Sequence, residues 1–460
     1  MEETKRSSFT GKIGFVLAAA GSAVGLGNIW RFPYLAAKYG GGIFLLVYIA
    51  LSVTFGFSLM IAEIAIGRKT KLSAIGAYRA LDKRFSFVGL LGSLVPIIIL
   101  PYYSVIGGWV MKYFVGFVSG QAGAMAQDSY FGDYIAKTGE PLAWFLAFIG
   151  ITAVVVLLGV NKGIEKVSKV MMPALVLLTL FITIYSICTL DGAIEGVLYY
   201  IKPDFSKFSI MTVVAAMGQL FYSMSLAMGI MITFGSYMKK EISIEKSTHQ
   251  IEIFDTGIAF LAGLMIVPAV YAFSGGDAAA LSQGPGLMFV TLPKVFETMP
   301  GGTVIGAAFF IMVFFAALTS SISLMETVVS IFLDKLKISR RLCCLIVLGI
   351  SLLLGIPSSL GYSAWSGVRL LGMQFLDFFD FVSNSVIMPV VALATAIFVG
   401  YFLTPKAVID EVELPDENGT AMHAFKWKKM FAVMIRYIAP ICILVILISS
   451  ILGAFGVVKI

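Results

Sequence analysis

Charged side chains are scarce in this sequence. Only 13% of its 460 residues are charged, about half the share typical of soluble domains, whereas 59% are hydrophobic and the mean hydropathy is +0.95. A single soluble domain of this size would lack the polar residues needed to cover its surface. Repeated apolar stretches of about 20 residues, each long enough to cross the roughly 30 Å hydrocarbon core of a lipid bilayer, account for this composition. The sequence therefore predicts an all-α polytopic membrane protein.

Histidine and cysteine are also rare, which argues against a metal centre or a catalytic site. The two histidines, His249 and His423, each lie beside charged residues in predicted loops. The four cysteines lie in apolar runs without the spacing of metal ligands: Cys188, Cys343, Cys344 and Cys442. No nucleophile is accompanied by a base, so we expect no enzyme activity. The net charge of +7 is distributed among loops, and we expect no nucleic-acid partner.

Hydropathy and turn patterns divide the chain into about eleven spanning segments. Their approximate cores are 13–36, 43–67, 88–117, 142–160, 167–188, 211–235, 254–274, 303–333, 341–357, 373–403 and 430–456. Lysine and arginine are concentrated in alternate connections, and the positive-inside rule then places the N-terminus in the cytoplasm and the C-terminus outside. No cleavable signal is evident, so we expect the first segment to direct membrane insertion.

Two kinds of connection stand out by length and composition. Three long outer connections, 118–141, 189–210 and 275–302, contain enough glycine, aspartate and aromatic residues to fold back over the protein. We expect the segment from Gly275 to Pro300 to form a helical hairpin over an outer vestibule. The acidic loop from Asp410 to Glu417 has the composition of a solvated cytoplasmic linker.

The first segment breaks the rules for a membrane helix. Gly21, Gly25 and Gly27 cluster near its middle and are followed by Asn28 and Arg31. Each glycine weakens a helix by roughly 1 kcal/mol relative to alanine. The carbonyls and amides released by a break find no partners in lipid and must face protein or a ligand. Close helix packing through small residues is the alternative explanation, but packing alone does not require the neighbouring Asn and Arg.

The sixth segment is interrupted in the same way. Between Gly218 and Gly229 it places Gln219, Ser223 and Ser225 in mid-membrane. Two broken helices five segments apart are what a pair of inverted repeats produces, and they predict a binding site near the bilayer midplane. Helix N-termini suit a carboxylate, while released carbonyls suit cations. A zwitterion with a sodium ion beside it would match both.

Ionisable and hydroxyl side chains within the predicted spans supply further candidates. A charged residue at the bilayer centre costs roughly 2.5–3.5 kcal/mol on insertion scales, so each one needs a reason. The carboxylates are Glu63, Asp255, Glu326, Asp377 and Asp380, with Arg31 as the main candidate counter-charge. In the eighth segment, Thr319 and Ser320 offer hydroxyls of the kind that bind a small hard cation, although such hydroxyls also bond to their own helix.

The run from Gly21 to Tyr34, Gly-Ser-Ala-Val-Gly-Leu-Gly-Asn-Ile-Trp-Arg-Phe-Pro-Tyr, resembles the first helix of the neurotransmitter:sodium symporter family. Further stretches agree in order: Ala62–Arg68, Lys162–Lys169, Gly218–Gly229, Gly284–Pro293 and Phe314–Ser321. The resemblance implies the leucine-transporter-type fold of the bacterial and archaeal amino-acid transporters. Its parts here would be a cytoplasmic gate segment (1–10), inverted repeats (11–188 and 211–403), a cytoplasmic linker (404–429) and a peripheral eleventh helix (430–460).

The resemblance also implies a ligand set for two sodium ions and an amino acid. The first sodium would be held by Ala23, Asn28, Ser223, Asp255 and the substrate carboxylate, and the second by Gly21, Val24, Ala316, Thr319 and Ser320. The substrate pocket would be lined by Gly25, Leu26, Gly27, Ile99, Tyr103, Tyr222, Ser223, Ser225, Met228 and Leu324. Relatives that carry amines have aspartate at the position of Gly25, so glycine favours an amino acid. Methionine is adaptable, and Met228 suggests room for a hydrophobic or aromatic side chain unless it only packs.

Gates and chloride dependence follow from the same resemblance. Arg31 with Asp380 resembles an outer gate pair beneath which Tyr103 and Tyr222 form a lid. Arg6 with Asp334 resembles an inner pair, with Tyr237 and Phe9 nearby. Many relatives have asparagine where Asp255 stands, and the chloride-dependent ones have serine at the position of Ala259. Tyr48, Gln219 and Ser223 match the other chloride ligands, but an anionic Asp255 would replace the ion, so we expect no chloride requirement.

These inferences predict a sodium-coupled symporter that works by alternating access in the plasma membrane of a prokaryote, with hydrophobic or aromatic L-amino acids as substrates. The alternative is an amino-acid-binding membrane sensor without net transport. Asp255 could also exchange protons. The sequence leaves the exact substrate, the sodium stoichiometry and the oligomeric state open.

Overall fold

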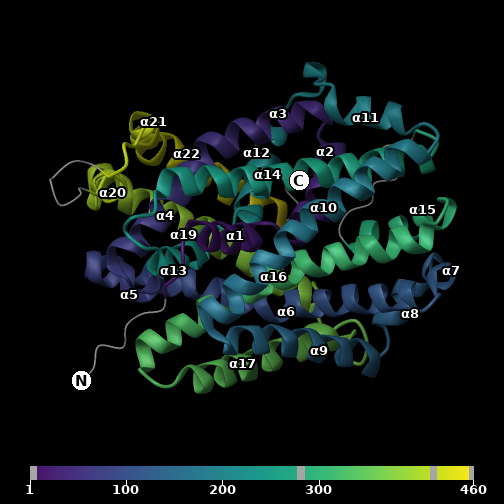
Figure 1. The fold of residues 1–460 in the computed structure, drawn as a ribbon, viewed down its shortest axis with the longest axis horizontal. Helices are drawn as coiled ribbons and strands as arrows, with labels where there is room; N and C mark the ends of the chain where they lie inside the picture. The colour runs from purple at the N-terminus through teal and green to yellow at the C-terminus, as the bar shows by residue number, and fades with distance from the viewer. Residues whose placement is uncertain (1–7, 277–284, 415–421, 455–460) are drawn as a thin grey trace.

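The computed structural model describes residues 8–276, 285–414 and 422–454. Within these ranges the chain is almost entirely helical (Figure 1), and the only β-type pairings are isolated bridges between Gly41 and Pro203 and between Leu370 and Met373. The predicted all-α polytopic fold is confirmed.

The first five predicted spans are all helical. Their elements are α1 (Lys12–Ala23), η1 (Gly27–Arg31) and α2 (Phe32–Lys38); α3 (Gly42–Leu51), η2 (Ser52–Gly56) and α4 (Phe57–Thr70); η3 (Lys83–Phe85) and α6 (Ser86–Val118); α9 (Gly139–Leu157); and η4 (Val160–Glu165) and α10 (Lys166–Thr189). The π-helical turns η1, η2 and η4 continue the α-helices beside them.

The remaining six predicted spans are also helical. They comprise α12 (Ile210–Ser223) and α13 (Ile230–Tyr237); α14 (Ile244–Phe273); α16 (Gly302–Leu336); α17 (Arg340–Leu360); α18 (Phe375–Asp380), η8 (Phe381–Ile387), α19 (Met388–Ile397) and η9 (Phe398–Phe402); and α21 (Lys428–Val433), η10 (Met434–Ile438) and α22 (Ala439–Ala454). In the described ranges, nine stretches are long and apolar enough to span a membrane alone, and the pair 12–23 and 27–38, bent by 55°, makes a tenth. The sixth predicted span consists of two short helices, α12 and α13.

The connections gather at opposite ends of the bundle. They contain α5 (Ala74–Leu81), α7 (Ala122–Met125), α8 (Tyr130–Ile135), α11 (Ala193–Ile201), η5 (Phe205–Lys207), η7 (Leu287–Thr291), α15 (Leu292–Thr298) and α20 (Pro405–Val412). Figure 1 shows α5, α20 and α21 at one end and α7, α8, α11 and α15 at the other. Helices α5 and α20 belong to the lysine- and arginine-rich connections, and α7, α8, α11 and α15 belong to the poorer ones, as the alternation of charge predicts.

Helix α13 is held against α4 by direct backbone contact. A Cβ atom on Gly67 would meet the carbonyl oxygen of Ile232, and one on Gly235 would meet that of Ile64. Small residues are what allow membrane helices to approach this closely. The two glycines therefore allow the backbones of α13 and α4 to pack in direct contact.

The linker after the tenth span corrects one expectation. We expect the loop from Asp410 to Glu417 to be solvated, but Glu411 lies in α20, is buried, and forms an ion pair of 2.8 Å with buried Arg68 at the end of α4. Arg68 also donates to the carbonyl oxygens of Glu411 and Ile242. Burial of α20 against α4 could not be read from the acidic composition. Residues 415–417 lie outside the described ranges.

The predicted outer hairpin is only partly described. The turns of η7 run directly into α15 as one helical stretch, and Pro285 before it lines an outer cavity. The other arm, across residues 277–284, lies outside the described ranges.

The Arg68–Glu411 pair gives a test of how the linker is held. In Glu411→Ala the Arg68 guanidinium stays buried without its carboxylate, and breaking a buried pair in this way costs about 3–5 kcal/mol. We expect a clear fall in the thermal unfolding midpoint of the purified protein in detergent. Lys137→Ala, which removes an exposed partner of Glu140, is the control and should leave the midpoint unchanged, because exposed ion pairs contribute little. Equal midpoints for both variants would contradict the role of the buried pair.

Candidate functional site

The first span is interrupted where its glycines predict. α1 ends at Ala23, Val24 has an extended backbone, and the helix resumes through η1. The released amides find side-chain partners: Gly25 N–H donates to Asn28 Oδ1 at 3.0 Å and Leu26 N–H to the Tyr103 hydroxyl at 3.2 Å. The break is thus stabilised by polar groups of the protein, as the absence of water in lipid requires.

The second interruption covers residues 224–229, between α12 and α13. Ser225, Ala227 and Gly229 have φ values of 53°, 61° and 73°, a left-handed conformation that costs a residue other than glycine about 1–3 kcal/mol. Glu63 on α4 supports this segment, because its Oε1 accepts from Ala227 N–H at 2.7 Å. Glu63, one of the candidate carboxylates of the sequence, thereby lies beside the second break.

Asp255 on α14 is the centre of a buried polar cluster that joins both breaks. Its Oδ1 accepts from Asn28 Nδ2 and from the Ser223 hydroxyl, both at 2.7 Å, and its Oδ2 accepts from the Tyr48 hydroxyl at 3.4 Å. Asn28 Nδ2 also lies 2.9 Å from Ser223 Oγ. Among the described residues no Lys, Arg or His pairs with Asp255. The cluster therefore offers a carboxylate and neutral oxygens to a cation.

A second cluster of oxygens surrounds Ser320 on α16. Its hydroxyl lies 3.3, 3.1 and 3.2 Å from the carbonyl oxygens of Gly21, Ser22 and Val24, and Thr319 Oγ1 lies 3.2 Å from the Ala316 carbonyl. One hydroxyl hydrogen cannot satisfy three carbonyls, so oxygen lone pairs are in surplus here. A surplus of neutral oxygens fits a small hard cation such as Na⁺.

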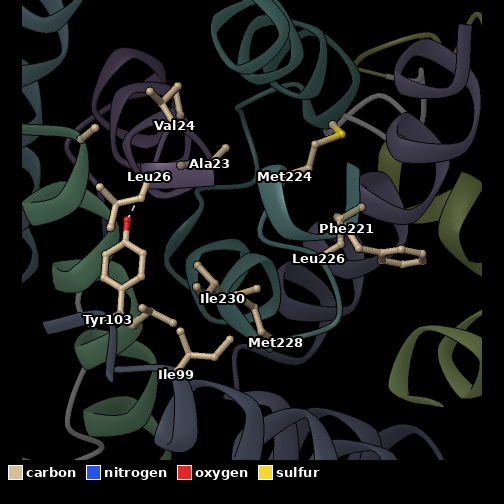
Figure 2. Close-up of a cluster of buried hydrophobic side chains, with 14 of the residues drawn as sticks. Ala23, Val24, Leu26, Ile99, Tyr103, Phe221, Met224, Leu226, Met228 and Ile230 are labelled. Carbon is tan, nitrogen blue, oxygen red and sulfur yellow. Dashed lines mark hydrogen bonds between the residues drawn. The ribbon is translucent and has the colours of Figure 1, made fainter. Parts of the chain in front are cut away.

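A small buried cavity lies between the two breaks. It is lined by Ser22, Ala23, Gly25, Leu26, Gly27, Asn28, Ile99, Tyr103, Tyr222, Ser225, Met228, Ile230, Ser320 and Leu324. These include nine of the ten residues expected around a substrate, and the tenth, Ser223, lies in the Asp255 cluster. Figure 2 shows Leu26 and Tyr103 on one side of this space and Ile99, Met228 and Ile230 close together on another.

Two lining residues were missed by sequence reasoning. Ser22 lines the cavity beside Ser225. The Ser225 hydroxyl donates to the Ser22 carbonyl oxygen at 2.9 Å, and the two hydroxyl oxygens lie 3.1 Å apart. Ile230 was hard to recognise as a lining residue from the sequence, since it is one apolar residue in an apolar run. Its place directly after Gly229, where α13 begins, was the available clue.

Tyr222 separates this cavity from a larger outer one of about 390 Å³. Its ring lines both spaces, and the Arg31 guanidinium lies 5.6 Å from the ring centroid. Arg31 and Asp380 both line the outer cavity, but they are not within 4.0 Å ion-pair distance. Asp380 instead accepts from the Tyr102 hydroxyl at 3.0 Å and from Asn384 at 2.6 Å. Both expected outer gate residues thus line the outer cavity, but they do not form an ion pair.

The opposite side of the cavity is sealed by a packed aromatic and ionic cluster. Phe9 is fully buried, packs against Tyr237, and donates its N–H to the Tyr237 carbonyl at 3.2 Å. The Tyr237 hydroxyl donates to Glu326 at 2.8 Å, and Glu326 pairs with Arg340. Asp334 accepts from Ser73 N–H at 2.7 Å. Arg6, its expected partner, lies outside the described ranges.

Comparison with known proteins agrees with this geometry. The profile of the Sodium:neurotransmitter symporter family matches residues 6–123 and 124–456. An uncharacterized sodium-dependent transporter of Bacillus subtilis, YhdH, is 36% identical over 98% of this chain and 99% of its own. The sodium- and chloride-dependent glycine transporter 1 of Xenopus laevis is 26% identical over 98% of this chain and 79% of its own.

A solved structure gives the same result for the fold. The crystal structure of MhsT in complex with L-phenylalanine superposes with a TM-score of 0.86 at 37% identity, covering 97% of this chain and 100% of MhsT. The protein therefore belongs to the sodium:neurotransmitter symporter family and is a multi-pass, sodium-dependent membrane transporter rather than an enzyme.

Proposed function

We propose that this transporter carries hydrophobic or aromatic L-amino acids together with sodium, by alternating access and without chloride. The observation that carries the proposal is the small buried cavity between two interrupted helices, polar at one end and apolar at the other. That MhsT was solved in complex with L-phenylalanine, at 37% identity, supports the same class of substrate.

The polar end of the cavity suits the carboxylate of an amino acid. Within the part of the chain that the structure describes, Leu26 N–H has only the Tyr103 hydroxyl as its partner, at 3.2 Å, so both groups can turn to a substrate carboxylate. A Cβ atom on Gly25 would lie 2.9 Å from Ser320 Oγ and 3.0 Å from the Tyr103 hydroxyl. An aspartate at this position, which an amine substrate would need, would require Ser320 and Tyr103 to shift. The site therefore favours a substrate with its own carboxylate.

The two oxygen clusters are proposed as sodium sites. The cluster of Asp255, Asn28 and Ser223, with the Ala23 carbonyl, would hold one ion next to the substrate carboxylate. The cluster of Thr319, Ser320 and the carbonyls of 21, 24 and 316 would hold the other. Because the first ion would touch the substrate, the binding of each would raise the affinity for the other.

Chloride independence rests on the charge of Asp255. The Asp255 carboxylate lies 3.4 Å from the Tyr48 hydroxyl and 2.7 Å from the Ser223 hydroxyl, two of the groups that would otherwise face chloride. Ala259, one turn along α14, offers no hydroxyl. A fixed carboxylate would thus supply the negative charge that an anion brings elsewhere.

Alternating access is supported by the difference between the two sides of the cavity. The outer gate groups Arg31 and Asp380 lie in an open space, while Phe9, Tyr237 and Glu326 close the other side. An ion pair in an exposed space contributes only about 0–1 kcal/mol, which suits a gate that forms and breaks in every cycle. The basic connections would face the cytoplasm of a prokaryote, with the two inverted repeats forming the core.

The first test is transport itself. In proteoliposomes with an inward sodium gradient, we expect uptake of a labelled hydrophobic amino acid, with Trp, Tyr, Phe, Leu and Ile the strongest inhibitors among the twenty amino acids. Preferred inhibition by Gly, Ala or charged amino acids would contradict the proposed substrate class. Counterflow separates a transporter from a sensor, because a sensor would bind the labelled amino acid without accumulating it.

A second test addresses chloride. We expect the same rate of sodium-driven uptake when chloride is replaced by gluconate on both sides of the membrane, because Asp255 supplies the charge. A collapse of uptake in gluconate would show that an anion is required.

A third test addresses the charge at the proposed first sodium site. Asp255→Asn keeps an oxygen to accept from Asn28 and Ser223 but removes the negative charge. A hydrogen bond or contact to a charged group is worth about 1.5–3 kcal/mol, so we expect the sodium concentration for half-maximal uptake to rise by about tenfold or more. Thr256→Val, at a neighbouring residue that bonds Ser52 instead, is the control. An unchanged sodium dependence in Asp255→Asn would exclude this carboxylate as a ligand.

A further inference from the structure

The apolar end of the buried cavity has one wall that the family resemblance did not assign. Ile99, Met228, Leu324 and Tyr222 were expected there, and Ile230 joins them. Figure 2 shows the Ile230 side chain directed toward the same space as those of Met228 and Ile99. Ile230 is 1% exposed, so it is part of the inner lining and not of a surface.

Ile230 is held more rigidly than Met228, another apolar wall of the cavity. It is the first residue of α13 and follows Gly229, whose φ of 73° turns the chain into the helix. The backbone of α13 touches that of α4 at Gly67 and Gly235, so this helix has no room to shift toward α4. A β-branched side chain in a helix is also confined to one main χ1 rotamer. The χ1 rotamer therefore fixes where the branched part of the Ile230 side chain lies.

Met228 is the opposite case. It lies in the non-helical segment 224–229, between the left-handed residues Ala227 and Gly229. Its unbranched, polarisable side chain can adopt several rotamers and fill gaps of different shapes. Met228 can therefore adapt to the substrate side chain, whereas Ile230 cannot.

The cavity is small enough for one side chain to matter. The cavity volume is about 30 Å³, and a single water molecule needs roughly 10–15 Å³. Removing three carbon atoms from a rigid wall changes a large share of this space, whereas the same change at a flexible wall can be absorbed.

We propose that Ile230 is a specificity-determining residue, which sets the upper limit on the length of the substrate side chain by forming the rigid end wall of the cavity. This inference rests on the proposed amino-acid function and deepens it. Met228 adjusts to the shape of the substrate side chain, whereas Ile230 excludes side chains that are too long. Shortening Ile230 therefore favours long aromatic substrates, and enlarging it favours short aliphatic ones.

The test is sodium-dependent binding of Leu and Trp to the purified full-length protein, with dissociation constants from displacement of a labelled amino acid. One methylene in an apolar pocket is worth about 10–200-fold in selectivity. We expect Ile230→Ala to shift the ratio of the two constants toward Trp by about tenfold or more. Ile230→Val should shift it less in the same direction, and Ile230→Phe should shift it toward Leu.

The matched control is Ile232→Ala, which makes the same substitution two residues along α13. Ile232 is buried to a similar extent, 2% exposed, but does not line the cavity. Thermal unfolding of each variant identifies any loss of folding, and Ile230→Val, the mildest change, keeps the series informative if Ile230→Ala is unstable. A graded shift across the Ile230 series that is absent in Ile232→Ala supports the proposal.

Two outcomes overturn it, and they are distinguishable. If the wild type binds these amino acids with sodium but the Ile230 series leaves the ratio as in Ile232→Ala, Ile230 does not set specificity, although the proposed function stands. If the wild type binds neither amino acid with sodium, both this inference and the proposed substrate class are wrong.

Discussion

The structure depends on one constraint: backbone amides and carbonyls that leave a helix inside a membrane must be satisfied by protein or ligand, because lipid offers no hydrogen bonds. Both interrupted helices obey it. The Leu26 amide meets the Tyr103 hydroxyl, and the Ala227 amide meets the Glu63 carboxylate. Among the described residues, the carbonyls of residues 21, 22 and 24 at the end of α1 share two hydroxyl donors, those of Ser320 and Ser225. The backbone groups that remain incompletely satisfied lie around the cavity, and that is where ligands can bind.

The same constraint explains why neighbouring helices carry polar residues at defined points. Glu63 lies on α4 opposite the left-handed segment 224–229, and Ser320 lies on α16 opposite the end of α1. The glycines of α4 and α13 bring these elements close enough for such contacts, as at Gly67 and Gly235. The proposed substrate position, the proposed ion sites and the helix packing are therefore consequences of the same two breaks.

Much of this was predictable from the sequence because it is local. Clustered glycines beside Asn28 signal a break whatever the surroundings, and the spans follow from hydropathy alone. The resemblance to a known family placed the cavity residues. Features set by tertiary contact were not predictable: Glu411 appears in an acidic loop but is buried against Arg68, and Ile230 is indistinguishable from its apolar neighbours. Glu326 likewise had no assigned role until the structure placed Tyr237 and Arg340 beside it.

The charge of Asp255 connects this architecture to coupled transport. It is fully buried and hydrogen-bonded by Asn28 and Ser223, yet no basic side chain among the described residues pairs with it. An uncompensated buried charge is costly, by about 3–5 kcal/mol when a partner is removed. A sodium ion at this cluster would remove that cost, and a substrate carboxylate placed beside it would add a second negative charge that only a cation can offset. In the proposed mechanism the amino acid and the ion each need the other, so the electrostatics of one buried carboxylate are sufficient to couple their binding.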